Sequence, residues 1–178
     1  MPENLLQLDG RVIVVAGAGG GGLGTTVTRM AARAGATVIG VSRGKENLDR
    51  HLGPLVAEWL AVIPVAADVE TDEGVAAVMD CVRATSGDLH GLVTVVGGGP
   101  PQTWGPATKV SRAAWDALFS TNLHSMFFIS QAIAAQLKAQ GRPGSLVAIS
   151  SITGVGNMPY NVGYGAAKAA VLSVGRTM

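Results

Sequence analysis

The chain is 178 residues long, which is typical of one domain with a sizeable buried core. Hydrophobic residues make up 48% of it and charged residues 14%, and 25 residues are glycine, a composition that favours an α/β fold with buried parallel strands and tight turns. The formal net charge of +1 gives no electrostatic basis for binding nucleic acid or an anionic membrane. No apolar run approaches the roughly 20 residues of a membrane-spanning helix.

Three simple features bear on the compartment and on metal binding. The N-terminal MPENLLQLDG has neither a basic segment nor an apolar segment, so we expect no signal peptide. A single cysteine, Cys81, cannot form an internal disulfide, and a cytoplasmic location is the default. The three histidines, His51, His90 and His124, are too scattered to predict a metal site.

A glycine-rich turn, Gly17–Gly24, lies between a β-branched run, Arg11–Ala16, and a helical pattern that extends to Arg33. In this context glycines let the backbone approach a pyrophosphate and leave helix N–H groups aimed at it. We therefore predict that the turn binds a dinucleotide, with Leu23 at the start of the helix. The pattern G-x-G-x-x-G fits in two registers, on Gly17, Gly19 and Gly22 or on Gly19, Gly21 and Gly24. The inward face of the helix is predicted to hold Val27, Met30 and Ala31.

The second predicted strand, Ala36–Ser42, is followed directly by Arg43. In dinucleotide folds an acidic residue near this position binds the ribose 2′-hydroxyl of NAD, whereas an arginine accommodates the 2′-phosphate of NADP. Ser42 occupies the place of the acidic residue, so the sequence favours NADP(H) over NAD. The alternative is that Arg43 is a solvated residue at the start of the next helix.

The remaining pattern alternates helices and strands, as in an open parallel sheet wound on both faces. Pro64 in the third strand indicates an edge strand or the end of a strand, which agrees with strand order 3-2-1-4-5. Thr108 or Ser111 is expected to cap the long helix. The predicted elements are a helix over Lys45–Leu60 interrupted at Gly53–Pro54, a strand over Val62–Ala66, a helix over Asp72–Thr85, a strand over Gly91–Val96 that His90 precedes, a long helix up to about Ala139 and a strand over Gly144–Ile149.

The stretch from Ser150 to Lys168 contains a candidate acid–base group. Tyr164 and Lys168 stand four residues apart in a helical pattern, so both side chains lie on one face, a single turn apart. A phenol, with a pKa of ~10, needs a cation beside it to exchange protons near neutral pH. Ser151 follows the apolar run that ends at Ile149, which places its hydroxyl at the carboxyl end of a strand, where ligands bind in such sheets.

Ser151, Tyr164 and Lys168 at these offsets resemble the active site of the short-chain dehydrogenase/reductase family, and in particular members such as the 3-oxoacyl-ACP reductases. The resemblance covers essentially the whole chain and implies a Rossmann-type doubly wound sheet that lacks the last strands of the family. Residues 1–178 are therefore expected to be one NAD(P)-binding domain, incomplete at its C-terminus. The family's TGxxxGxG pattern is matched only imperfectly, and its Asn-Asn-Ala-Gly after strand four is replaced by Thr94–Gly97.

The resemblance also implies roles for individual residues. Tyr164 would donate the proton, Ser151 would polarise the reacting oxygen, and Lys168 would assist Tyr164, with Tyr164 and Lys168 both contacting the cofactor. Asn122, by its position in the long helix, matches the family's catalytic asparagine, which holds a water that relays protons toward the lysine. The alternative from the residues alone is an asparagine that kinks the helix by bonding to its backbone.

Other positions implied by the resemblance line the cofactor. Asp68 would reach the adenine ring and Val69 would pack on it, whereas the residues alone allow Asp68 to cap the helix that starts near Thr71. Gly97 would let the cofactor ribose approach the end of the fourth strand.

The function expected from this sequence is NADP(H)-dependent hydride transfer to or from a small carbonyl or secondary alcohol. The alternatives are a truncated, non-catalytic NAD(P)-binding protein and an epimerase or lyase on the same scaffold. A homodimer or homotetramer is expected through the helices at 111–140 and 160–178, because the first has apolar residues on more than one side. Neither nucleic acid nor a membrane is an expected partner.

Overall fold

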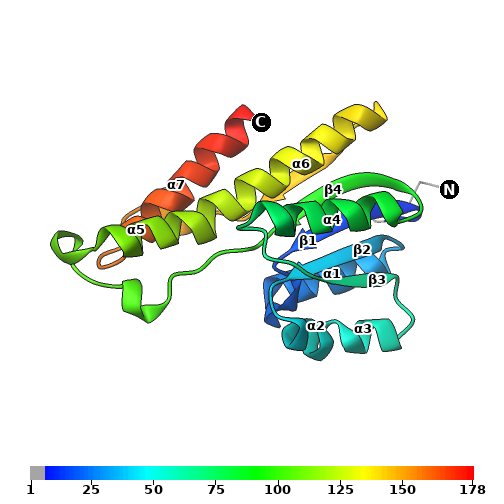
Figure 1. Cartoon of the computed structure of the whole chain (residues 1–178), viewed down its shortest axis with the longest axis horizontal. Helices are drawn as coiled ribbons and strands as arrows, with labels where there is room; N and C mark the ends of the chain where they lie inside the picture. Colours follow the sequence, from blue (N-terminus) through cyan, green and yellow to red (C-terminus); the bar gives the residue numbers. More distant parts are fainter. Residues whose placement is uncertain (1–6) are drawn as a thin grey trace.

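Five parallel strands form one sheet in the order β3-β2-β1-β4-β5, as the sequence predicts (Figure 1). The structure, a computed structural model, describes residues 7–178, so most of the segment on which the signal-peptide expectation rests lies outside the described residues. The strands are β1 (Arg11–Ala16), β2 (Thr37–Ser42), β3 (Val62–Ala66), β4 (Asp88–Thr94) and β5 (Ser145–Ala148).

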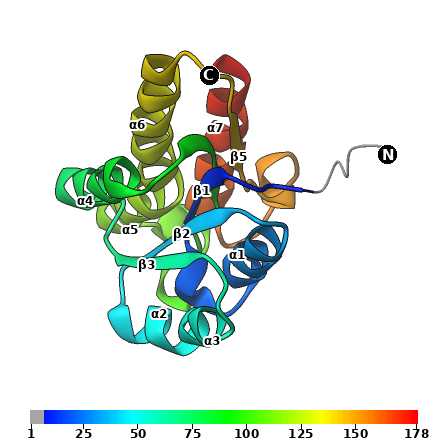
Figure 2. The same cartoon turned by 90° about the vertical axis from the view of Figure 1, so that its right-hand side faces the viewer.

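Helices cover both faces of the sheet (Figure 2). The helices are α1 (Leu23–Arg33), α2 (Lys45–His51), α3 (Gly53–Ala57), α4 (Asp72–Ala84), α5 (Arg112–Phe119), α6 (Ser125–Gln140) and α7 (Val162–Thr177). One face packs against α1, α2 and α3, and the other packs against α4 and α6. Helix α7 lies beside α5 and α6 (Figure 1). Among the described residues, no helix is both long and apolar enough to cross a membrane.

The central strand β1 joins the two cores. Side chains alternate across a strand, so Val12 and Val14 enter the core shared with α4 and α6, while Val15 enters the core shared with α1 to α3. Both neighbours of β1 are hydrogen-bonded strands, which explains its nearly continuous apolar sequence. Strand β3 is an edge strand, as Pro64 predicts, since a proline has no N–H to donate to a ladder and is tolerated where one side of the strand has no neighbour.

Two local predictions were wrong. Met30 is 67% exposed, because the inward face of α1 is built from Thr25, Thr28 and Ala32. The two threonine hydroxyls are satisfied by donating to backbone carbonyls, so small polar residues can pack on this face. Val27 and Ala31, which were also predicted to face inward, do pack against the core. His90 lies inside β4 rather than before it, with its Nδ1 2.6 Å from the carbonyl oxygen of Asp88.

Helix boundaries follow the expected capping chemistry. The predicted break at Gly53–Pro54 separates α2 from α3, with the proline in the first turn of α3, where a missing N–H costs no helical bond. Thr71 caps α4, with its hydroxyl oxygen accepting from the Gly74 N–H at 3.0 Å. Asp68 instead accepts from the Glu70 N–H at 3.0 Å, so the alternative of Asp68 as a helix cap was wrong. Ser111, not Thr108, caps α5.

The long helix predicted up to Ala139 is divided. Helix α5 and helix α6 are joined by one turn of π-helix, Ser120–His124, which contains Asn122. A π-helical turn inserts an extra residue and turns the following side chains relative to the preceding ones. The sequence pattern gave no sign of this change in period apart from the polar residues of the turn.

Candidate active site

A cavity of about 270 Å³ opens at the carboxyl ends of β1, β2, β3 and β4, the position where open parallel sheets bind ligands. Six of the residues predicted to bind a cofactor line it, namely Gly17, Ser42, Arg43, Asp68, Val69 and Gly97. They come from four different strand ends, and the fold brings them to one place. Gly19, Gly22, Leu23 and Gly24 belong to the adjoining turn and the start of α1.

The glycine turn is shaped by close backbone packing. Gly17 has a φ of 93°, which favours glycine, and a Cβ on Gly24 would collide with the carbonyl oxygen of Gly17. A Cβ on Gly19 would lie 2.9 Å from the Ser42 side chain. By contrast, Gly20 lines the cavity and Gly22 caps α1, and a Cβ on either would meet nothing within 4 Å.

The start of α1 suits an anion. Gly22 provides no side chain to accept from the first N–H groups of the helix. Those N–H groups and the positive end of the helix dipole therefore remain available at the edge of the cavity. The residues present thus fit the pyrophosphate of a dinucleotide.

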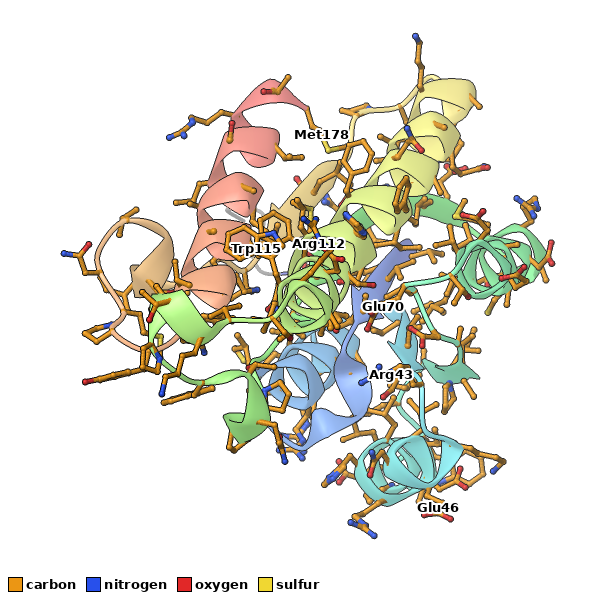
Figure 3. The ribbon with its side chains drawn as sticks, turned by 60° about the vertical axis from the view of Figure 1, so that its left-hand side comes forward. Arg43, Glu46, Glu70, Arg112, Trp115 and Met178 are labelled. Carbon is orange, nitrogen blue, oxygen red and sulfur yellow. The ribbon has the colours of Figure 1, made fainter. Side chains whose placement is uncertain are left out.

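The far end of the cavity contains an ion pair that the sequence analysis missed. Arg43 Nη1 lies 3.3 Å from Oε1 of Glu70, and both residues line the cavity (Figure 3). Glu70 also accepts from the hydroxyl of Ser120 at 2.7 Å and from that of Thr121 at 3.1 Å. In the sequence, Glu70 is recognisable only as an acidic residue shortly after the end of a strand. Glu70 therefore links the cavity to the π-helical turn.

At the other end, Lys168 fixes α7 to the end of β5. Its Nζ donates to the carbonyl oxygen of Ile149 at 3.0 Å, and the hydroxyl of Ser150 donates to the carbonyl oxygen of Lys168 at 2.7 Å. The side chain is almost fully buried, and this burial lowers the pKa of Lys168 below its ordinary value. Ser150 is a second contributor that the sequence analysis did not name.

Tyr164 and Ser151 are the other two residues expected to act on the substrate oxygen, and both precede Lys168 in the chain. Lys168 Nζ is 5.9 Å from the centroid of the half-buried Tyr164 ring, as the four-residue spacing predicts. The Ser151 oxygen accepts from the backbone N–H of Thr153 at 3.2 Å and from its hydroxyl at 3.0 Å. Two donors on the Ser151 oxygen orient the hydroxyl, which keeps its own hydrogen for donation.

Asn122 is fully buried and bonds to backbone. Its Nδ2 donates to the carbonyl oxygens of Leu118 at 2.9 Å and Gly98 at 2.8 Å, and its Oδ1 accepts from the Gly98 N–H at 2.9 Å. This confirms the interpretation of Asn122 as a backbone-bonded residue at an irregular turn. Both Nδ2 hydrogens are used, so only a free lone pair of Oδ1 is left for a water, and the proton relay stays a prediction.

Gly97 lies between the predicted cofactor cavity and the buried side chains of Asn122 and Lys168. A Cβ at this position would lie 2.7 Å from Asn122 Oδ1 and 2.8 Å from Lys168 Nζ, and Gly97 also lines the cavity. The buried amine and amide thus stand directly against the wall of the predicted cofactor site.

The chain matches the profile of the family described as short chain dehydrogenase over residues 11–178. It is similar to the gluconate 5-dehydrogenase of Gluconobacter oxydans, with 34% identity over 175 residues that cover 98% of this chain and 66% of that protein. It is also similar to the 3-oxoacyl-[acyl-carrier-protein] reductase of Thermotoga maritima, with 29% identity over 97% of this chain and 68% of that protein. The chain thus spans about two thirds of the length of these curated relatives.

Solved structures agree. A gluconate 5-dehydrogenase from Burkholderia cenocepacia in complex with NADP and tartrate superposes with a TM-score of 0.84 at 29% identity, covering 95% of this chain and 64% of that one. A short-chain type dehydrogenase/reductase from Mycobacterium ulcerans gives a TM-score of 0.85 at 30% identity, covering 93% of this chain and 60% of that one. An NAD⁺-bound xylitol dehydrogenase, 23% identical, has the same fold with a TM-score of 0.84.

Proposed function

Because this chain belongs to the short-chain dehydrogenase family, we propose that it is an NADP(H)-dependent oxidoreductase acting on a carbonyl or secondary alcohol. The family supports an NAD(P)-dependent oxidoreductase scaffold. Catalysis in this chain is supported by the contact of Asn122 and Lys168 with Gly97, which lines the cavity proposed for the cofactor. Lys168 lies one helical turn after Tyr164.

The cofactor would be held by groups of three kinds. The turn from Gly17 to Gly24, with Leu23 at the start of α1, would bind the pyrophosphate through backbone N–H groups. Asp68 and Val69 would border the adenine, although Val69 is also part of the core below. Gly97, Tyr164 and Lys168 would border the nicotinamide riboside. When bound, the nicotinamide supplies or accepts the hydride.

The protein residues would handle the proton and the charge on the substrate oxygen. In the reducing direction Tyr164 donates its phenolic proton to the oxygen as negative charge develops there. Ser151 donates a hydrogen bond to the same oxygen, and this bond strengthens as the charge grows. The Lys168 ammonium stabilises the negative charge left on the phenol. Asn122 holds the π-helical turn and the Gly97–Gly98 backbone in place.

The preference for NADP(H) rests on Ser42 and Arg43 at the end of β2. No carboxylate follows the strand directly to accept from a ribose 2′-hydroxyl, and Arg43 is two-thirds exposed and lines the cavity. The Glu70 carboxylate opposes this preference, since a 2′-phosphate must share Arg43 with it. A single contact at 3.3 Å leaves other guanidinium donors free for a phosphate.

The test is the Tyr164→Phe variant, assayed for oxidation of NADPH by a panel of ketones. Turnover is expected to fall by roughly 10²–10⁴-fold, since a phenyl ring cannot donate a proton. NADPH binding, followed by its fluorescence, should stay nearly unchanged. Near-normal turnover in the variant would refute the assignment of Tyr164.

A second candidate is a non-catalytic NAD(P)-binding protein, the alternative that the sequence leaves open. NADPH binding without turnover of any ketone would support it. In either case we propose that residues 1–178 form one NAD(P)-binding domain. Assembly into a homodimer or homotetramer through α5, α6 and α7, and a cytoplasmic location, stay predictions.

A further inference from the structure

The segments around the proposed reaction centre contain no charged side chain. Residues 94–108 and 143–167 have no Asp, Glu, Lys, Arg or His, although the whole chain has 13 basic and 12 acidic residues. The first segment contains Gly97, and the second contains Ser151 and Tyr164. A substrate oxygen held by Ser151 and Tyr164 would therefore border two uncharged segments, with the buried Lys168 as the cation beside Tyr164.

The two segments touch each other, so they form one wall. The N–H of Gly105 donates to the carbonyl oxygen of Tyr160 at 2.7 Å. The indole N–H of Trp104 donates to the carbonyl oxygen of Gly99 at 2.9 Å, which fixes the ring beside the loop that begins at Gly97. The wall is thus held by backbone bonds that need no charged residue.

Large apolar side chains on this wall face outward. Ile152, the residue after Ser151, is 80% exposed, and Val155 is 73% exposed. Tyr160 is 64% exposed and Trp104 is 52% exposed. A cavity of about 520 Å³ beside these residues, between 153–162 and the start of α7, is lined only by uncharged residues, with Thr153, Asn157 and Asn161 as its polar side chains.

Three basic residues follow these two segments closely in the sequence, namely Lys109, Arg112 and Lys168. The amine of Lys168 is buried and donates to the carbonyl oxygen of Ile149. Arg112 borders a different cavity, together with Trp115 and Val162 (Figure 3). Lys109 is exposed at the end of the short turn Ala107–Lys109, and none of the three residues lies in the segment that contains Ile152 and Val155.

We propose that the substrate is an uncharged ketone or secondary alcohol with an apolar alicyclic or aromatic body, a proposal that rests on the oxidoreductase function above. An apolar body gains by covering exposed aliphatic and aromatic surface. A carboxylate would lose its hydration against this wall without gaining a counter-ion.

This choice differs from the substrates that the names of two relatives state. Gluconate is an anion, and the carrier protein of the 3-oxoacyl reductase is a macromolecular partner. Identity at about one third of the positions establishes that this chain and its relatives share a fold, whereas the choice of substrate depends on the side chains of the wall.

The test measures binding and turnover of two probes by the full chain. Saturation-transfer NMR with and without NADPH compares 2-tetralone, a neutral bicyclic ketone, with 5-keto-gluconate. We expect 2-tetralone to bind about tenfold or more tightly and to oxidise NADPH with a higher kcat/KM. Equal or tighter binding of 5-keto-gluconate, or no binding of 2-tetralone at millimolar concentration, would overturn the proposal. Failure of NADPH to bind would refute the oxidoreductase function instead, and the probe comparison without cofactor would still decide between the substrates.

Two variants tie the result to the wall. Ile152→Glu should weaken 2-tetralone binding by about tenfold, because a carboxylate replaces apolar contact surface. Met30→Glu is the matched control, since Met30 is also an exposed apolar residue but lies on α1, away from the wall. If Ile152→Glu proves unfolded by circular dichroism, Val155→Glu replaces it. Equal effects of the wall variant and the control would contradict the proposal.

Discussion

The glycine turn and the Asn122–Lys168 region are held in place in different ways. The turn between β1 and α1 is shaped by local backbone geometry, with Gly17 at positive φ and Gly24 against it. The opposite end of the site depends on side chains that bond to backbone far away in the sequence, such as Asn122 to Gly98 and Lys168 to Ile149. The conformation of the glycine turn is therefore predictable from a short motif, whereas the Asn122–Lys168 region forms only when α5 to α7 pack together.

The largest expected effect follows from Asn122→Ala. The substitution leaves the N–H and carbonyl of Gly98 and the carbonyl of Leu118 without the bonds that Asn122 makes. A typical intramolecular hydrogen bond contributes about 0.5–1.5 kcal/mol, so the loss of these three bonds should lower the free energy of unfolding by roughly 3 kcal/mol. Urea denaturation measures it. Asn157→Ala, at an exposed loop position, is the control. A loss below ~1 kcal/mol would mean that water replaces the amide.

The glycine turn should respond to Gly24→Ala but not to Gly20→Ala. A Cβ on Gly24 meets the Gly17 carbonyl and the Val95 side chain, whereas a Cβ on Gly20 meets nothing within 4 Å. Overpacking of this kind costs about 1–3 kcal/mol. We expect Gly24→Ala to lower both the stability and the affinity for NADPH, as measured by denaturation and fluorescence titration. Gly20→Ala is the control for stability only, because Gly20 lines the cavity. Equal stability of the two variants would contradict the described packing of the turn.

The buried Lys168 predicts a pH dependence of stability. Burial lowers its pKa, so the unfolded chain binds more protons at this site than the folded chain between the lowered value and the ordinary 10.5. The free energy of unfolding therefore rises with pH across that window, with a slope of at most about 1.4 kcal/mol per pH unit for one group. Lys168→Met should remove this part of the slope. An unchanged slope in the variant would show that the amine is not desolvated.

The smallest effect is expected from Glu70→Gln. The change removes the negative charge opposite Arg43 and keeps an oxygen to accept from Ser120 or Thr121. A partly screened charge at this range contributes on the order of 1 kcal/mol, so NADPH should bind a few-fold more tightly. NADH, which lacks the 2′-phosphate, serves as the internal control. An equal change for both cofactors would mean that Glu70 acts only on the π-helical turn.

Sequence alone determined much of this protein. The order of the strands follows from alternating patterns and from Pro64, and the glycine turn follows from its place between a strand and a helix. The spacing of Tyr164 and Lys168 sufficed to predict that the two lie on one face of a helix. These features depend on neighbours in the chain, where periodicity and backbone preference are decisive.

The tertiary structure alone decided the rest. Three features join residues that are distant in sequence. They are the bonds from Asn122 in the π-helical turn to Gly98, the pairing of Glu70 with Arg43, and the bond from Ser150 to α7. Met30 faces outward on α1, whereas Thr25 and Thr28 face inward with their hydroxyls donating to backbone carbonyls. Counting apolar residues in the sequence does not predict this arrangement. Buried polar groups must be satisfied by whatever the packed chain brings near, so their partners are fixed by the fold as a whole and not by any local pattern.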